Sequence, residues 1–462
     1  MATFYIEQFG CRATQADGAA IDRQLRERGC SQARSAESAD VVVFNTCTVT
    51  AAADAQAREA IRKLHAANPA TRVIVTGCYA QRAPEELALL PGVSHVVGNS
   101  HKPQIADLLA GTLRGSTENF VPTENLLAPI LTGDIFEQHN VLVAPILGGE
   151  SNHTRPTLKI QDGCNNRCAF CVIPFVRGKS RSLPPQTVIE EINKLVRSGY
   201  KEIVLSGINL GAWGRDLSPR QVFSDLLKRI LYETSLERLR LSSIEPLDVT
   251  RDLILLFAST PRLAEHFHMP LQSGSDNILA GMHRWYRAGH YARRIELICE
   301  HAPHAAIGAD VIAGFPGETE EDHAATMDFI ERRRFTYLHV FSYSSRPGTR
   351  AACLPGHVAP KIIKQRANQL RTLGEAKSAS FHRSQAGRTL QALTLRHTDR
   401  EPARREPGIP DPTDWTPALS SNYLKLRISG SWLPNRFMNV VCSADQQTLA
   451  APELQPAEPI VL

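Results

Sequence analysis

A short cysteine-rich loop constrains this chain more than any other feature of its sequence. Cys164, Cys168 and Cys171 stand in a C-x3-C-x2-C spacing directly after the apolar run Leu158–Gln161. Three thiolates in one loop can hold three irons of a 4Fe-4S cluster and leave the fourth iron open to another ligand. Structural zinc is the alternative, but it needs four protein ligands, and no nearby Cys or His supplies the fourth. The spacing therefore favours an open iron–sulfur cluster.

Short apolar runs alternate with helical periodicity on the carboxyl side of this loop, from Thr157 to about Arg334. Such alternation predicts an α/β fold built from right-handed βαβ units. Six units would form an incomplete TIM-like barrel, whose site should lie at the carboxyl ends of its strands. The predicted strands are Leu158–Gln161, Glu202–Ser206, Arg238–Ser242, His266–Pro270, Ala306–Ala313 and Tyr337–Ser342.

The chain of 462 residues is long enough for about three domains. Residues 1–112 alternate in the same way on a smaller scale and predict an open α/β domain. Residues 113–149 lack periodicity and are expected to form a linker. The partial barrel is then expected over residues 150–382, and a small β-rich domain over residues 383–455.

Three further cysteines follow predicted strands of the N-terminal domain. Cys11, Cys47 and Cys78 each stand just past the end of a short β-branched run. In an open parallel sheet the carboxyl ends of the strands lie along one edge, where ligands bind, so these thiols can converge. Three buried structural cysteines are the alternative. Four other cysteines have no partner spacing and are interpreted as incidental apolar residues: Cys30, Cys299, Cys353 and Cys442.

Composition bounds the compartment and the partners. The sequence has 10 Cys and no start resembling a signal peptide, so we expect a cytoplasmic protein whose clustered cysteines bind metal rather than form disulfides. No apolar stretch approaches the roughly 20 residues that span a bilayer, so no membrane partner is expected. The net charge of +5 permits a nucleic-acid partner without requiring one.

The cysteine loop resembles the cluster loop of radical S-adenosylmethionine enzymes, whose open iron binds that cofactor. Together with the segments Phe9–Cys11, Asn45–Thr50 and Thr76–Gln81, it is similar to the methylthiotransferases, a subfamily with a second, N-terminal 4Fe-4S cluster. The resemblance implies two 4Fe-4S clusters and S-adenosylmethionine as cofactors, with the N-terminal cluster supplying or carrying the inserted sulfur. The implied cluster ligands are Cys11, Cys47, Cys78, Cys164, Cys168 and Cys171.

The same resemblance implies the side chains that contact S-adenosylmethionine. They are Phe170, Glu245, Gln272 and Asp310. Phe170 matches the aromatic residue that packs near the adenine of the cofactor. The chain departs from the family at Thr14, where Asn is usual, and at Gly18, so the contacts around the first cluster are not carried over.

Two features suggest contact with RNA. Arg177, Lys179 and Arg181 follow the cluster loop, and cationic side chains position RNA through its phosphates; a solvated loop is the alternative. The segments Ser421–Leu426 and Phe437–Val440 resemble the TRAM domain, a small β-barrel that binds tRNA. A generic small β-domain is the alternative for this tail.

Three branches of the family differ in substrate. The segments Lys159–Cys164, Ser242–Pro246 and Leu338–Ser344 are most similar to the branch that acts on threonylcarbamoyladenosine in tRNA. The resemblance implies conversion of N6-threonylcarbamoyladenosine at position 37, 3′ to the anticodon, to its 2-methylthio derivative. Methylthiolation of isopentenyladenosine or of a ribosomal-protein aspartate, and a non-catalytic iron–sulfur RNA-binding protein, remain alternatives.

The implied partners are a tRNA anticodon stem-loop, an electron donor such as a flavodoxin or ferredoxin, and an unknown sulfur donor. One S-adenosylmethionine would methylate sulfur at the N-terminal cluster, and a second would be cleaved at the other cluster to a radical that abstracts the adenine C2 hydrogen. No catalytic residue beyond the cluster ligands is expected, because the cofactors carry the chemistry and the protein orients them.

Overall fold

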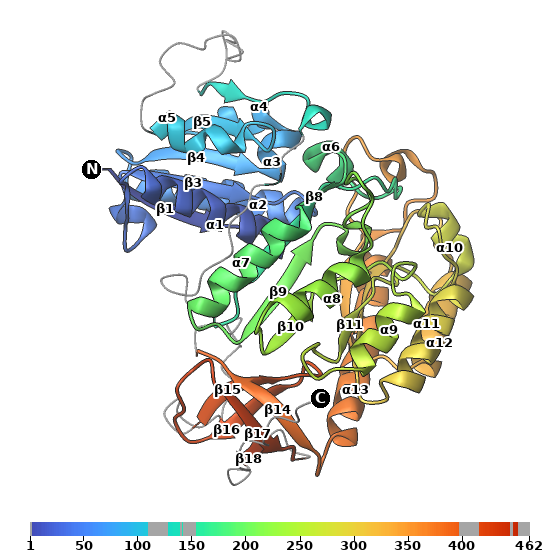
Figure 1. Ribbon diagram of the computed structural model, residues 1–462. Coiled ribbons are helices and arrows are strands. Elements are labelled where there is room, and N and C mark those ends of the chain that lie inside the picture. The colour runs from blue at the N-terminus through green and yellow to red at the C-terminus, as the bar shows by residue number, and fades with distance from the viewer. Residues whose placement is uncertain are drawn as a thin grey trace.

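The computed structural model describes residues 2–109, 128–138, 141, 154–396, 415–443 and 447–450. These residues form an N-terminal α/β domain, a larger α/β core and a C-terminal β-barrel, with the N-terminal domain and the barrel at opposite ends of the core (Figure 1). None of the helices in these ranges is long and apolar enough to cross a membrane.

The N-terminal domain is built on a six-stranded parallel sheet. In spatial order its strands are β2 (Ser31–Gln32), β1 (Thr3–Gln8), β3 (Val41–Thr46), β4 (Arg72–Gly77), β5 (Val93–Gly98) and β6 (Ile130–Leu131). Its helices are α1 (Arg12–Glu27), α2 (Ala51–Ala67), α3 (Cys78–Arg82), α4 (Pro84–Ala88) and α5 (Ile105–Leu109).

Helices cover both faces of this sheet, and β3 is buried along its whole length. Val41 and Val43 pack in one apolar cluster with α1 and α5, whereas Val42 and Phe44 pack in another with α2 and α4. Because successive side chains of a strand point to opposite faces, a strand covered on both sides reads as a continuous apolar run. The β-branched run at 41–44 is therefore explained by this position in the sheet.

The predicted linker at 113–149 is wrong in part. Ile130–Leu131 forms β6 and pairs with β5, so this segment supplies the last strand of the N-terminal sheet. Two residues make too short a strand for a periodic pattern. The rest of the predicted linker lies outside the described residues, apart from residues 128–138 and 141.

The core contains two sheets. In one, parallel strands β10 (Arg238–Leu241), β9 (Glu202–Gly207) and β7 (Thr157–Asp162) are followed by the short antiparallel β8 (Arg181–Ser182). In the other, β11 (His266–His268), β12 (Ala306–Ala313) and β13 (Tyr337–Ser342) are parallel. An isolated parallel bridge between Ser243 and His268 joins the two sheets, so the six predicted strands of the core are confirmed as parallel neighbours.

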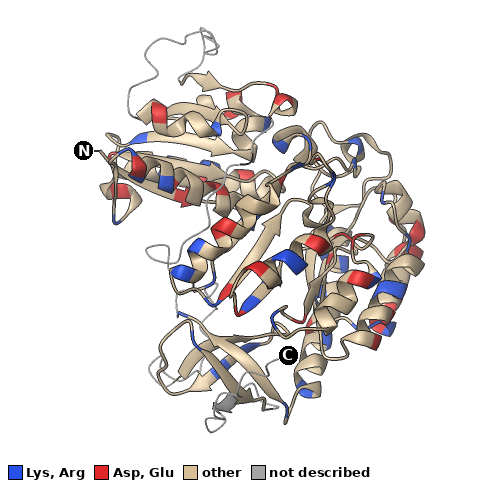
Figure 2. Ribbon diagram, in the orientation of Figure 1, with Lys and Arg blue, Asp and Glu red and all other residues tan. Residues whose placement is uncertain are grey.

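Most of the helices pack against these strands through one large apolar cluster, whereas Val176 of α6 packs in a smaller one with Cys78. In α7, for example, Val188, Ile189, Ile192 and Leu195 form one buried stripe. The helices are α6 (Ile173–Arg177), α7 (Pro185–Arg197), α8 (Phe223–Glu233), α9 (Arg251–Ala258), α10 (Asp276–Gly281), α11 (Ala288–His301), α12 (Glu320–Arg332) and α13 (Pro360–Ser384). Figure 2 shows Lys and Arg interspersed with Asp and Glu over the outer helices, so this view has no single basic face.

The C-terminal domain is a closed β-barrel. Its strands, in order around the barrel, are β14 (Thr389–Thr394), β15 (Trp415–Ser420), β16 (Lys425–Ser429), β18 (Gln447–Ala450) and β17 (Phe437–Val441). β15 contains Pro417, and proline is unusual inside a strand because it has no backbone N–H to donate. β15 nevertheless pairs with both β14 and β16, and the carbonyl of Pro417 accepts a hydrogen bond from the Leu395 amide at 2.7 Å.

A buried carboxylate joins the core to this barrel. Glu202, at the start of β9, pairs with Arg238 at 3.2 Å and with Arg240 at 2.8 Å, and all three side chains are fully buried. The same guanidinium groups reach the barrel: Arg238 donates to the Gln391 side chain at 2.7 Å, and Arg240 donates to the Ser420 carbonyl at 2.9 Å. Glu202 therefore neutralises the two cations that hold the barrel.

We predict that Glu202→Gln destabilises the protein by about 3–5 kcal/mol at neutral pH, because it leaves two buried cations without their anion. Burial raises the pKa of Glu202, but Arg240, Arg155 and Arg238 outweigh burial and lower this pKa from 4.5 to about 2. The stabilisation is therefore present above pH 4.5 and is lost as the pH falls toward 2. Urea unfolding of both proteins across this range should show their difference shrinking.

The matched control is Glu233→Gln, which removes a carboxylate from a solvent-exposed pair with Arg229. It should change the unfolding free energy little. A difference between wild type and Glu202→Gln that stays constant down to pH 2 would contradict the role given to Glu202.

Candidate active site

One cavity of about 1110 Å³ is lined by all three parts of the protein. The core contributes the cysteine loop and the carboxyl ends of its strands, the N-terminal domain contributes Cys11 and Arg12, and the barrel contributes Tyr423 and Lys425. Parallel strands present their carboxyl ends at one edge, where loops build ligand sites. The cavity therefore lies where the βαβ pattern predicts the site.

The core cysteines follow β7 in a tight loop, and Cys164, Cys168 and Cys171 all line the cavity. The loop turns at Gly163, which has φ +70°, a conformation that glycine adopts without strain. A Cβ at this position would collide with the carbonyl of Lys179. The loop is closed by a hydrogen bond from the Cys164 amide to the Gly178 carbonyl at 3.0 Å.

These thiols are sheltered from water, and this shelter raises their pKa values. Burial raises the pKa of Cys164 to about 11 and that of Cys171 to about 12. For Cys168, burial also raises the pKa, but Arg284 opposes it with a guanidinium nitrogen 3.1 Å from the sulfur. Three convergent soft ligands with a cation beside one of them fit an iron–sulfur cluster, whose ligands are thiolates.

The N-terminal cysteines lie at one edge of their sheet, because β1, β3 and β4 are adjacent and parallel. Cys11 caps the start of α1, Cys47 follows β3, and Cys78 begins α3. A Cβ on Gly10 would collide with Cys47, so only glycine lets the first two segments approach so closely. Burial is the main cause that raises the pKa of Cys47 to about 12, and the negative charges of Cys78 and Cys11 contribute to the same shift. The three sulfurs are therefore close enough to interact electrostatically.

Two polar side chains, Thr14 and Asn99, contact these sulfurs, and the sequence did not single out Asn99. The Thr14 hydroxyl lies 3.6 Å from the Cys11 sulfur, at the position where the family usually has Asn. The Asn99 side-chain nitrogen lies 3.6 Å from the Cys78 sulfur and also donates to the Val176 carbonyl at 2.8 Å. Thr14 follows Cys11 by three residues in the first turn of α1, whereas no periodic pattern relates Asn99 to Cys78.

A buried ion network connects the two sets of cysteines. Asp17 in α1 pairs with Lys102 at 2.8 Å and with Arg177 at 2.9 Å, and it also pairs with Lys159 of β7. Asp162, at the end of β7, pairs with Lys159 at 2.9 Å and with Arg177 at 3.0 Å. The network thus ties the helix that follows Cys11 to the strand that precedes Cys164.

The prediction that Arg177 and Arg181 bind RNA is wrong. Arg177 is 2% exposed and is occupied by Asp17 and Asp162, and Arg181 is 8% exposed. Of the three predicted cations only Lys179 is exposed. Local sequence marks these residues as a basic loop, whereas Arg177 pairs with Asp17 of α1 and Arg181 lies near Asp162 of β7.

The residues predicted to contact the cofactor are brought together, because Phe170, Glu245, Gln272 and Asp310 all line the cavity. Gln272 has φ +65°, a conformation that non-glycine residues rarely adopt and that clusters at functional sites. Its amide donates to the Asp310 carbonyl at 2.8 Å, which holds the two segments together. Glu245 is held by an ion pair with Arg284.

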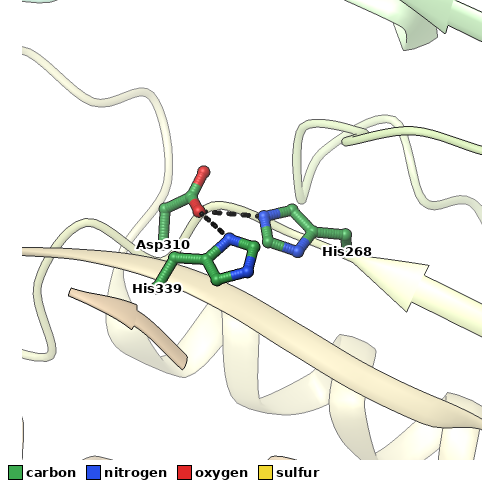
Figure 3. A group of neighbouring side chains, drawn as sticks. All are labelled: His268, Asp310 and His339. Carbon is green, nitrogen blue, oxygen red and sulfur yellow. Dashed lines mark hydrogen bonds and ion pairs between the residues drawn. The ribbon is translucent and has the colours of Figure 1, made fainter. Parts of the chain in front are cut away.

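His268, Asp310 and His339 form a polar cluster on the cavity wall that the sequence did not predict (Figure 3). A ring nitrogen of His268 lies 3.0 Å from Asp310 Oδ1, and one of His339 lies 3.3 Å from the same oxygen (Figure 3). The other ring nitrogen of His268 is 2.9 Å from the Tyr337 hydroxyl. Hydrogen bonds from His268 and His339 outweigh burial and hold the pKa of Asp310 below its usual range.

Comparisons with known proteins agree with this arrangement. Residues 3–98 match the model described as uncharacterized protein family UPF0004, and residues 158–330 match the radical SAM superfamily. A structure of the radical S-adenosylmethionine methyltransferase TsrM from Kitasatospora setae, with cobalamin and a 4Fe-4S cluster bound, superposes with a TM-score of 0.58 and 16% identity. The superposition covers 76% of this chain and 77% of that one, and it supports the fold alone.

Two curated relatives align along most of the chain. Threonylcarbamoyladenosine tRNA methylthiotransferase MtaB of Aquifex aeolicus (strain VF5) is 37% identical over 390 residues, 84% of this chain and 92% of that protein. The tRNA-2-methylthio-N(6)-dimethylallyladenosine synthase of Arthrobacter sp. (strain FB24) is 36% identical, over 86% of this chain and 74% of that protein. Fold and site define a radical S-adenosylmethionine enzyme with an added N-terminal α/β domain. Within that class, the chain belongs to the methylthiotransferase family.

We predict that Asp17→Asn lowers the free energy of unfolding by about 3–5 kcal/mol, because the substitution leaves Lys102, Lys159 and Arg177 buried without this anion. Chemical denaturation at neutral pH measures the change. Glu27→Gln is the control in the same helix, since Glu27 pairs with Arg23 on the exposed face, and it should change stability little. Equal effects of the two substitutions would contradict the anchoring role of Asp17.

Proposed function

We propose that this protein is a tRNA methylthiotransferase that converts N6-threonylcarbamoyladenosine at position 37, 3′ to the anticodon, to its 2-methylthio derivative. The observation that carries the proposal is that Cys11 and all three core cysteines line the same cavity. A sulfur source and a radical source must both reach one carbon of the base, and a shared cavity meets this requirement. The MtaB relative carries this activity in its name.

In this proposal Cys164, Cys168 and Cys171 hold one 4Fe-4S cluster, and Cys11, Cys47 and Cys78 hold the other. When bound, the clusters and S-adenosylmethionine supply the radical, the methyl group and the sulfur. The chain's own residues orient these groups and exclude water. Arg284 sits between the Cys168 sulfur and Glu245 and compensates negative charge there.

Phe170, Glu245, Gln272 and Asp310 are proposed to contact S-adenosylmethionine, and the two parallel sheets of the core to correspond to an incomplete TIM barrel. The C-terminal barrel is proposed to be a TRAM-like domain that holds the anticodon stem-loop. Lys425 on its β16 and Lys179 beside the cluster loop are exposed cations that can contact phosphates. A loop base can be splayed out of the anticodon into the cavity at modest cost.

The electron donor, a flavodoxin or a ferredoxin, is proposed to dock beside the core cysteine loop. Trp285 is 70% exposed there, and the neighbouring His283 ring is 3.2 Å from the Arg167 carbonyl within the loop. Arg284, between these two residues, contacts the Cys168 sulfur. This short path from surface to thiolate suits an acidic redox partner. We place the reaction in the cytoplasm, as the composition predicts.

Mutation should distinguish the roles of the two sets of cysteines. Cys168→Ala should abolish formation of 5′-deoxyadenosine, because it removes a ligand of the radical-generating cluster. Cys47→Ala should retain part of this cleavage and abolish thiolation. Product analysis by liquid chromatography and mass spectrometry checks both, with iron and sulfide content confirming the remaining cluster. Identical behaviour of the two variants, with the core cluster intact in Cys47→Ala, would contradict this division of labour.

Nucleoside analysis of tRNA from a deletion strain tests the substrate. We expect 2-methylthio-N6-threonylcarbamoyladenosine to disappear and its unthiolated precursor to accumulate. Restoration by the wild-type gene, but not by the Cys168→Ala gene, is the control. Normal levels of this nucleoside together with loss of 2-methylthio-isopentenyladenosine would instead assign the protein to the other tRNA branch.

A further inference from the structure

Arg12 stands out among the cations of the cavity because no partner holds it. It lines the cavity in a half-buried position, and within the described ranges its side chain makes no hydrogen bond or ion pair. Arg12 is also the first residue of α1, where the helix dipole disfavours positive charge, and the first turn contains no acidic residue. A guanidinium in this position is best stabilised by an anion that enters the cavity.

The other arginines near this part of the cavity are already neutralised. Arg284 pairs with Glu245, and Arg155 and Arg240 pair with Glu202. Lys425 lines the same cavity but is solvent-exposed at its rim. Among the described residues that line the cavity, Arg12 is therefore the sheltered cation whose N–H groups remain available to a ligand.

Tyr423 of the barrel lines the same cavity as Arg12. Its ring stacks on His266 with centroids 4.1 Å apart, and its φ of +67° is rare for a tyrosine. Burial raises the pKa of Tyr423, but Arg12 is the first of four cations that outweigh burial and lower it. No hydrogen bond of its hydroxyl is found within the described residues. A tyrosine hydroxyl and a guanidinium that line one cavity, neither with a partner among the described residues, can both donate to the same anion.

The chemistry of the proposed substrate supplies a matching anion. The threonylcarbamoyl group ends in a carboxylate and is attached to N6, whereas thiolation occurs at C2, and C2 and C6 both flank N1 of the six-membered ring. The exocyclic bonds at C2 and C6 diverge in the ring plane, so a base that presents C2 to the cysteines holds its N6 substituent to one side of them. Arg12, which follows Cys11, and Tyr423 and Tyr337 line the cavity that receives this substituent. Both tyrosines are within the field of Arg12.

We propose that Arg12 and the hydroxyl of Tyr423 bind the carboxylate of the threonylcarbamoyl substituent and so select this base. The inference rests on the proposed function and adds the residues that recognise the N6 substituent. An isopentenyl group has no carboxylate, so it would leave Arg12 unpaired against an apolar chain. Such a loss of a charge-assisted contact discriminates more strongly than a change in apolar fit.

The test measures binding of anticodon stem-loop RNAs to the anaerobically reconstituted holoenzyme. Three RNAs of one sequence carry threonylcarbamoyladenosine, isopentenyladenosine or unmodified adenosine at position 37. Wild type should bind the first at least about 10-fold more tightly than the other two. Arg12→Gln should weaken binding of the first RNA by about 10- to 100-fold and leave the others within about 2-fold. Arg12→Lys should recover part of the preference, and Tyr423→Phe should lose less of it than Arg12→Gln.

Lys425→Gln is the matched control, because it removes a cation from the rim of the same cavity and should affect all three RNAs alike. If Arg12→Gln also weakens all three RNAs alike, Arg12 is a phosphate contact and the inference is overturned. A fall in iron and sulfide content in Arg12→Gln would overturn it as well, because Arg12 would then serve the neighbouring cluster. If wild type neither prefers nor thiolates the threonylcarbamoyl RNA, the proposed function itself fails, and that result is seen before any variant is compared.

Discussion

The relative position of the two cysteine sets depends on one buried carboxylate. Asp17 lies in the helix that begins directly after Cys11, and it pairs with cations on both sides of the core cysteine loop: Lys159 in the strand before it and Arg177 in the helix after it. Buried charges persist only when each is paired, so neither side can shift without exposing an uncompensated charge. This contact therefore fixes the geometry of the shared cavity.

The opposite wall of the cavity depends on a second buried carboxylate. Glu202 neutralises Arg238 and Arg240, and these two arginines bind backbone and side-chain groups of the C-terminal barrel. The barrel in turn positions Tyr423 against His266. The cavity thus exists because three separate folding units meet around two ionic junctions, and each unit contributes side chains that the others lack.

Much of the fold could be read from periodicity, since the core strands and the buried strand at 41–46 have clear apolar patterns. Two of the strands that escaped prediction have identifiable causes: Ile130–Leu131 is too short for any pattern, and Trp415–Ser420 contains a proline in a Pro-rich surrounding. Arg177 was wrongly predicted to bind RNA for a different reason. A basic loop next to a site resembles an RNA contact, and only its acidic partner from another domain shows otherwise.

The sequence by itself determined which residues can carry the chemistry. Cysteine spacing is a local property, and the ends of parallel strands must share an edge, so the two cysteine sets and the cofactor-facing loops follow from order along the chain. Only the tertiary structure decided how the units dock and which cations stay free. Asp17 and Lys159 are 142 positions apart, and Arg12 and Tyr423, from the two terminal domains, line one cavity. Contacts between separate units depend on the complementarity of their surfaces, and no period along the sequence encodes that complementarity.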